Sequence, residues 1–170
     1  MEYLELDLEK IARLGEQNEE ENFGFRIFLK SQDTSKVDKI VYQLNKEITS
    51  QIDCQKCGNC CKSLKPCIKE SDIKKFAQTM NVSPADFLSR FVEKDTSMES
   101  KHLNASPCIF LKNKTCTIYD DRPDDCRSFP HTQKPGFISR TLSMIHNYGI
   151  CPIVFNLFEE LKFELKYRRL

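Results

Sequence analysis

The sequence predicts a mainly α-helical protein with a small β-hairpin, folded as a compact domain around a metal. Apolar residues recur at helical spacing in several segments. Nine cysteines occur among the 170 residues, four of them between positions 54 and 61. We therefore expect the metal's cysteine ligands to come from loops and helix ends within a single domain that carries terminal extensions.

The cysteine-free N-terminal segment predicts helices. A loosely helical pattern comes first, and residues 23–30 then favour either a strand or an irregular segment. Asp33 or Thr34 can cap the helix that follows, because both side chains can accept hydrogen bonds from a helix start. Its apolar positions recur at helical spacing, which predicts core packing: Val37, Ile40, Val41, Leu44, Ile48 and Ile52.

Two short helices and a hairpin are expected next. Ser71 can cap the first helix, and Ser83 can cap the second, which has Pro84 at its first position. The polar residues 94–106 predict a loop. Residues 108–119 predict a hairpin with one cysteine on each arm.

The C-terminal third is less regular until its end. Residues 121–130 predict one helical turn closed by a proline, and residues 131–150 match neither a helical nor a strand pattern clearly. Pro152 is expected to open a terminal helix that reaches Leu170, because proline is well tolerated at a first helical position.

These elements predict a division into three parts. Residues 1–53 form an N-terminal helical extension that packs on the core. Residues 54–152 form the cysteine-cluster domain that binds metal, and residues 153–170 form a C-terminal helix on the same core.

Composition narrows the class of protein. The 26 Lys and Arg residues nearly balance 25 Asp and Glu residues, which argues against a nucleic-acid partner. No apolar run reaches the roughly 20 residues that span a bilayer, so no membrane partner is expected. The acidic N-terminus lacks the pattern of a signal peptide, which favours a cytoplasmic location. Thiols stay reduced there, and the odd cysteine count favours metal or redox chemistry over disulfides.

The run from Cys54 to Cys61 indicates a thiolate metal site. Cys54, Cys57 and Cys60 have the C-x2-C-x2-C spacing of bacterial iron–sulfur sites, where a remote cysteine followed by proline completes the set. Cys151 precedes a proline and is the candidate for that position. Zinc sites use similar spacings, so an iron–sulfur cluster is slightly favoured and zinc stays open. Gly58 would allow a tight turn within the run.

The adjacent pair Cys60 and Cys61 raises the question of two metal centres. Neighbouring side chains tend to point apart, so the two thiols serve either adjacent centres or one centre with the second thiol held nearby. One partition assigns four cysteines to each of two sets, namely Cys54, Cys57, Cys60 and Cys151, and Cys61, Cys108, Cys116 and Cys126. Cys67 is left over as an ordinary thiol or a further ligand. His131 is a structural histidine, a metal ligand or a group that supports the metal site.

The cysteines and their neighbours together resemble a known family. The ordered motifs are Cys54-x2-Cys57-Gly-x-Cys60-Cys61, Pro107-Cys-x-Phe-Leu, Cys116-x-Ile-Tyr and Arg122-Pro-x-x-Cys126-Arg-x-Phe-Pro, followed by a late cysteine. This combination resembles the CxxCxxCC family of zinc- or iron-chelating domains, the YkgJ-type cysteine cluster proteins, and flagellin lysine methylases contain a related cluster.

The resemblance covers roughly residues 54–152 and implies eight metal ligands: Cys54, Cys57, Cys60, Cys61, Cys108, Cys116, Cys126 and Cys151. Tyr119, Arg122 and Arg127 also match. The guanidinium groups either offset the charge of a thiolate cluster or anchor the turn through backbone carbonyls.

Three functions are compatible with these features. The first is a metal-binding protein whose site organises the fold. The second is a cluster-dependent enzyme, methyltransferase-like or redox, although the sequence has no phosphate-binding glycine loop and no serine elbow. The third is an accessory protein that delivers metal or senses redox state, with residues 1–53 as the surface for a protein partner. Neither enzymatic activity nor a substrate follows from the sequence.

Overall fold

The chain forms two compact units in the computed structural model, which describes residues 3–95 and 99–167. We call residues 1–53 and 130–170 the helical unit, and residues 54–129 the cysteine unit. Residues 130–152, which the sequence grouped with the cysteine cluster, thus pack with the helical unit. The last three residues of the expected terminal segment, 168–170, lie outside the described residues.

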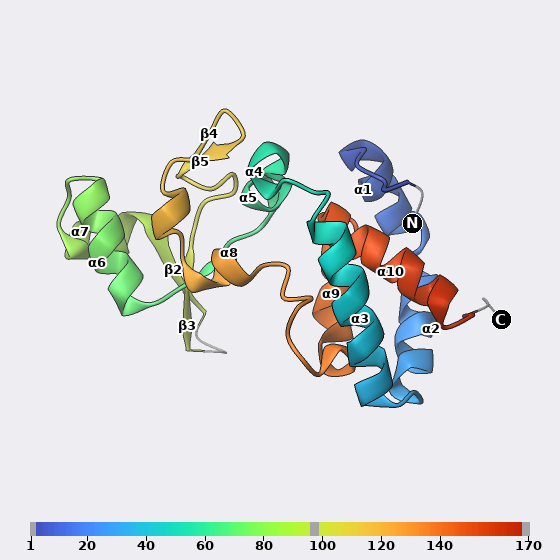
Figure 1. Ribbon diagram of the computed structural model, residues 1–170. Helices are drawn as coiled ribbons and strands as arrows, with labels where there is room; N and C mark the ends of the chain where they lie inside the picture. The colour runs from blue at the N-terminus through green and yellow to red at the C-terminus, as the bar shows by residue number, and fades with distance from the viewer. Residues whose placement is uncertain (1–2, 96–98, 168–170) are drawn as a thin grey trace. The chain divides into compact units, whose positions relative to one another are not determined.

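The predicted fold class is confirmed, because helices dominate both units and the strands are short (Figure 1). The helical elements of the helical unit are α1 (Leu8–Gln17), α2 (Glu19–Lys30), α3 (Thr34–Thr49), the 3₁₀ turn η2 (Phe137–Arg140), α9 (Thr141–Tyr148) and α10 (Pro152–Glu164). Those of the cysteine unit are α4 (Cys54–Cys57), α5 (Asn59–Ser63), α6 (Glu70–Thr79), α7 (Pro84–Phe91), the 3₁₀ turn η1 (Tyr119–Asp121) and α8 (Asp124–Ser128).

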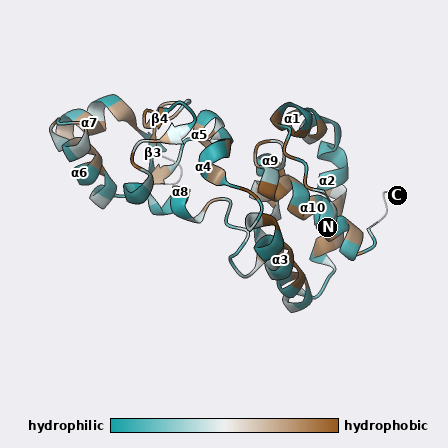
Figure 2. Ribbon diagram, turned by 45° about the horizontal axis from the view of Figure 1, so that its top comes forward, coloured by the Kyte–Doolittle hydropathy of each residue, from teal (hydrophilic) through white to brown (hydrophobic). Residues whose placement is uncertain are grey.

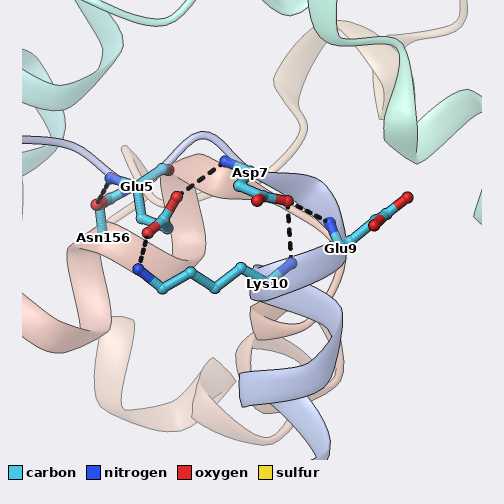
Figure 3. A network of polar contacts seen from close by, with 5 residues as sticks. All are labelled: Glu5, Asp7, Glu9, Lys10 and Asn156. Atoms are coloured by element: carbon cyan, nitrogen blue, oxygen red, sulfur yellow. Dashed lines mark hydrogen bonds and ion pairs between the residues drawn. The ribbon is translucent and has the colours of Figure 1, made fainter.

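A polar network fixes the start of α1 in the helical unit (Figure 3). The Asp7 carboxylate caps the helix by accepting the backbone N–H groups of Glu9 and Lys10 at 2.9 and 3.1 Å. The Asn156 carboxamide of α10 pairs with the backbone of Glu5 in both directions, each bond being 2.9 Å long. The segment before α1 is therefore tied to α10.

Helix α3 begins where the sequence predicted, with Asp33 accepting the Lys36 N–H at 2.7 Å. Hydrophobic and hydrophilic residues alternate along it (Figure 2). Four of the six predicted core positions are buried, namely Val37, Val41, Leu44 and Ile48. Ile40 is only half-buried, and Ile52 lies beyond the end of the helix.

The prediction of a strand or irregular segment at residues 23–30 is wrong, because these residues belong to α2. Phe25 and Leu29 lie one turn apart and are buried, whereas Phe23 and Ile27 lie one turn apart and are exposed. Apolar residues on both faces obscured the helical period. The Phe25 ring packs edge-on against Phe158 of α10, with ring centroids 5.9 Å apart.

The terminal helix opens at Pro152, as predicted, but it ends at Glu164. Lys166 adopts a left-handed conformation with φ of 52°. The N–H of Tyr167 then bonds to the Lys162 carbonyl at 2.9 Å, which closes the helix end in the way left-handed C-caps do.

The predicted loop at residues 94–106 is wrong for most of its described length. Strands β1 (Cys67–Ile68), β2 (Val92–Asp95) and β3 (Ser100–Leu103) form an antiparallel sheet in the order β1-β3-β2. Val92 follows directly on the last residue of α7 and begins β2. Few residues of this sheet reach the core, with Ile68 and Leu103 buried, so the sequence has no clear alternation of apolar and polar residues.

The predicted hairpin is confirmed as β4 (Leu111–Lys112) and β5 (Thr115–Cys116). Asn113 and Lys114 connect the strands with φ of 50° and 66°. Positive φ at both central residues is typical of the two-residue turns that match strand twist. Cys116 lies on β5, but Cys108 lies before β4.

Helices α6 and α7 pack with the strands into the core of the cysteine unit, which includes Phe76, Phe87, Leu103 and Phe110. Ser83 caps α7 as predicted, accepting the Asp86 N–H at 3.0 Å. The predicted cap at Ser71 is wrong. The cap is Lys69, two residues earlier, where the Asp72 carboxylate accepts the Lys69 N–H at 2.8 Å. No helix of the described residues is long and apolar enough to cross a membrane.

A close backbone crossing in the helical unit predicts opposite effects for two glycine substitutions. A Cβ added at Gly15 of α1 would lie 2.6 Å from the Gly149 Cα, whereas one at Gly24 of α2 would meet only the Tyr167 hydroxyl, at 2.8 Å. Both Gly→Ala changes gain helix propensity of about 0.5–1 kcal/mol. We expect Gly15→Ala to lower the free energy of unfolding by about 1–3 kcal/mol through overpacking.

Gly24→Ala should leave stability unchanged or raise it, because the end of a tyrosine side chain can move. Urea unfolding of both variants, followed by far-UV circular dichroism, measures the difference. Equal effects of the two substitutions would show that the crossing does not constrain the fold.

Candidate functional site

Eight of the nine cysteines belong to the cysteine unit, and they lie on different elements. Helix α4 carries Cys54 and Cys57, and α5 carries Cys60 and Cys61. Cys67 lies on β1, Cys108 in the loop before the hairpin, Cys116 on β5 and Cys126 on α8. Cys54 is exposed and the other seven are partly buried.

Gly58 joins the two short helices that carry the first four cysteines. Its φ of 60° is left-handed, as the sequence predicted, and its N–H bonds to the Cys54 carbonyl at 3.1 Å. A Cβ at this position would lie 2.7 Å from the carbonyl oxygen of Lys114, in the hairpin turn. The tight turn between α4 and α5 therefore lets the hairpin approach closely.

A backbone hydrogen bond joins α5 to the segment before the hairpin. The Cys108 N–H donates to the Cys61 carbonyl at 2.8 Å. The hairpin then pairs Leu111 with Cys116. Cys108 and Cys116 both pack against the core of the unit, so their positions depend on its hydrophobic packing.

The Cys61 thiol has a lowered pKa. A hydrogen bond with the Cys60 thiol and the positive charge of Arg122 lower the pKa of Cys61 to about 7, although burial opposes this shift. At neutral pH this thiol is therefore divided between its protonated form and the thiolate, the form that binds metals.

Three other thiols have raised pKa values. Burial is the main cause in each case, and the charge on Cys61 contributes to all three: Cys108, Cys116 and Cys126. The pKa of Cys126 rises to about 12, and Cys108 and Cys116 add to that shift. The four thiols are thus close enough for the charge of one to change the proton affinity of the others.

Arg122 and Arg127 hold the turn before Cys126. The Arg122 guanidinium donates to the Tyr119 carbonyl at 2.7 Å and lies 3.6 Å from the centroid of its ring. Arg127 donates to the carbonyls of Asp120 and Arg122 at 3.0 and 3.3 Å. Both arginines anchor the turn. The charge of Arg122 also contributes to the lowered pKa of Cys61 and partly offsets the rise in the pKa of Cys116.

One further carboxylate contributes to the arrangement, although the sequence did not single it out. Asp125 accepts the Cys67 N–H at 2.9 Å and so ties α8 to β1. Its only sequence signal is its place beside Cys126, because acids at a helix start are common for electrostatic reasons. The backbone of Cys67 thus helps to position α8, whatever the role of its thiol.

Two predicted site residues belong to the helical unit. Cys151 is 7% exposed at the start of α10, and its N–H donates to the Asn147 carbonyl at 2.8 Å. His131 has a left-handed φ of 64°, and its carbonyl accepts from Arg140 at 3.4 Å. Their roles as metal ligand and supporting group stay predictions.

The donor set fits a thiophilic metal, because soft thiolates select zinc or iron–sulfur clusters. Within the described parts of the chain, no three Cys, His, Asp or Glu side chains are already placed to hold a metal ion. Metal binding by cysteines generally requires the thiols to deprotonate and converge, which couples binding to local folding.

Comparison with known proteins agrees with the chemistry of the donors. The family model CxxCxxCC, described as "Putative zinc- or iron-chelating domain", matches residues 53–151. No curated protein and no solved structure matches the chain. The match covers more than half of the sequence and supports metal binding in general. The chain therefore belongs to the CxxCxxCC family.

Proposed function

We propose that this protein binds an iron–sulfur cluster or zinc through the thiolates of its cysteine unit. Cys61, Cys108, Cys116 and Cys126 form one ligand set, which we call the inner set. The observation that carries the proposal is the backbone bond from the Cys108 N–H to the Cys61 carbonyl, which joins α5 to the segment before the hairpin that carries Cys116. The charge of Cys61 also raises the pKa values of the other three thiols, which come from separate segments.

The inner set is suited to hold a cation because its own charges repel. Four thiolates would carry four negative charges in a partly buried site, and burial already disfavours ionisation of three of them. A bound cation or a cationic cluster core would remove that penalty. The Arg122 guanidinium, fixed by its carbonyl bond and its contact with Tyr119, would offset the remaining charge.

A second set of ligands lies along the C-x2-C-x2-C run. Cys54, Cys57 and Cys60 come from the two short helices that Gly58 joins. The hydrogen bond between the Cys60 and Cys61 thiols supports a position for this second set beside the inner set. We propose two adjacent centres. Cys151, which the sequence predicts as the fourth ligand of the second, belongs to the helical unit, and its role stays a prediction.

The identity of the metal can be tested by purifying the protein without oxygen and measuring iron, sulfide and zinc. The C-x2-C-x2-C spacing and the Cys151-Pro152 pair favour iron and sulfide in equal amounts, with a brown colour. Colourless protein that contains only zinc would exclude the cluster and retain thiolate binding. Protein that retains neither metal and takes up neither on reconstitution would contradict the proposal.

Substitution of the inner cysteines should remove metal. We expect Cys108→Ser, Cys116→Ser and Cys126→Ser each to lower the metal content by the equivalent of one centre, because a hydroxyl is a poor ligand for thiophilic metals. Cys67→Ser is the matched control, since this cysteine is in the same unit but outside the inner set.

Metal content per chain, with circular dichroism to check folding, is the measurement. If Cys67→Ser loses as much metal as Cys126→Ser, the proposed grouping is wrong. Cys54→Ser tests the second set. With two centres it should remove one and leave the inner set loaded, whereas a single shared centre would be lost completely.

Metal affinity should fall as the pH is lowered. A thiol whose pKa lies above the working pH must release its proton when the metal binds. Each proton released changes the metal affinity about tenfold per pH unit. Cys108, Cys116 and Cys126 have raised pKa values, and that of Cys61 is about 7. The inner set should therefore release about three protons at pH 8 and about four at pH 6.

Zinc titrations in buffers with different ionisation enthalpies count these protons. They should be made on a Cys54→Ser variant so that the inner set dominates the signal. An affinity that does not change between these two pH values would show that the inner thiols are not the ligands.

The tight turn at Gly58 gives a structural test. Gly58→Ala would place a side chain in a left-handed conformation, at a cost of about 1–2 kcal/mol, and only 2.7 Å from the Lys114 carbonyl oxygen. We expect weaker metal retention. In Gly136→Ala the φ is also left-handed, but the nearest atoms to a new Cβ are side-chain atoms 3.6 and 3.7 Å away.

The Gly136 variant therefore controls for backbone strain alone, and it should keep its full metal content. Metal retention during dialysis against a chelator compares the two variants. Equal retention would mean that the approach of the hairpin to Gly58 does not support the metal site.

A further inference from the structure

We propose that the helical unit binds a small aromatic anion, such as an aromatic phosphate ester, in a cleft beside α3. The cleft has a volume of about 440 Å³ and lies between α3 and residues 132–135. It is formed entirely by the helical unit, so the proposal goes beyond the proposed metal function and does not depend on it.

The wall opposite α3 is held in place by hydrogen bonds to that helix. The two carboxylate oxygens of Asp38 accept the N–H groups of Gly136 and Phe137 at 2.7 and 2.9 Å. At the other end of the segment, the Thr132 hydroxyl donates to the Asn45 carboxamide oxygen at 2.5 Å. Both ends of the loop are thereby anchored on α3.

Arg140 stabilises the same loop from within. Its guanidinium donates to the backbone carbonyls of Lys134 and Pro135, and to those of Gly136 and His131 at 3.2 and 3.4 Å. Four carbonyls thus converge on one cation, which fixes the loop without a ligand. A site that is already ordered loses little conformational entropy when a ligand binds.

The surfaces of the cleft favour a flat apolar group. Val41 is 2% exposed and lines the cleft together with Pro135. Tyr42, which also lines it, is 63% exposed, which is unusual for so large an aromatic side chain. A planar ring could stack on Tyr42 and cover this apolar surface. The volume of the cleft, about 440 Å³, is within the range of about 300–1,000 Å³ for small-molecule sites.

The charge of the cleft favours an anion. Lys39 and Lys134 both line it, and neither forms an ion pair with a carboxylate of the described residues. Asp38 is the acidic residue of the lining, and its two oxygens already accept backbone N–H groups. Two ammonium groups beside an exposed aromatic ring match a ligand that carries a phosphate or carboxylate on a ring.

The test is a titration of the isotope-labelled full-length protein with phenyl phosphate, followed by amide resonances. We expect saturable shifts at Tyr42 and Gln133, which line opposite walls of the cleft. Phenol lacks the charge and inorganic phosphate lacks the ring, so each should bind at least about fivefold more weakly if both features contribute. Equal responses to phenyl phosphate and phosphate would overturn the aromatic requirement, and absence of saturable shifts would overturn the site.

Charge-neutral variants locate the binding. Lys39→Gln combined with Lys134→Gln should weaken phenyl phosphate binding at least about fivefold, because both ammonium groups would face the anion. Lys36→Gln is the matched control, since this lysine is exposed on α3 and does not line the cleft. Equal affinities of the control and the double variant would contradict the proposal, and Tyr42→Ala should remove the preference for phenyl phosphate over inorganic phosphate.

Discussion

The electrostatic cost of gathering thiols is the constraint on which the cysteine unit depends. Burial and the charge of Cys61 raise the pKa values of Cys108, Cys116 and Cys126, so the metal-free unit disfavours the thiolate forms that a metal requires. Without placing any three described side chains to hold a metal ion, the fold still keeps these thiols within range of one another's charges. Three features that need no metal are responsible. They are the tight turn at Gly58, the hydrogen bond from the Cys108 N–H to the Cys61 carbonyl, and the packing of Cys108 and Cys116 against the hydrophobic core.

The helical unit is stabilised mainly by a hydrophobic core. Its core is aromatic and aliphatic, with Phe25, Phe137 and Phe158 in edge-on contact, and its loops are fixed by side chains such as Asp38 and Arg140. Such a core gains most of its stability from burial of apolar surface. Its folding does not require thiolates to converge, so loss of metal should affect the cysteine unit first.

Local signals predicted local structure well. The cap at Asp33, Pro84 at the start of α7, the hairpin and the turn at Gly58 each depend on residues close in sequence. The sheet β1-β3-β2 depends on long-range pairing of short polar strands, which have no periodic signal. Spacing likewise predicts cysteine ligands, but it could not establish which thiols are neighbours. That information comes from the bond between Cys108 and Cys61, from the approach of the hairpin to Gly58, and from the bond that ties α8 to β1.

The adjacent pair Cys60 and Cys61 shows how two ligand sets can be coupled. Successive residues of a helix point in directions about 100° apart, and in α5 the two thiols still share a hydrogen bond. Cys61 belongs to the proposed inner set, whereas Cys60 belongs to the proposed second set. A metal on either thiolate would change the proton affinity of its neighbour, because their charges interact at short range. Occupation of one centre would then alter the affinity of the other, a coupling that two separated sites would lack.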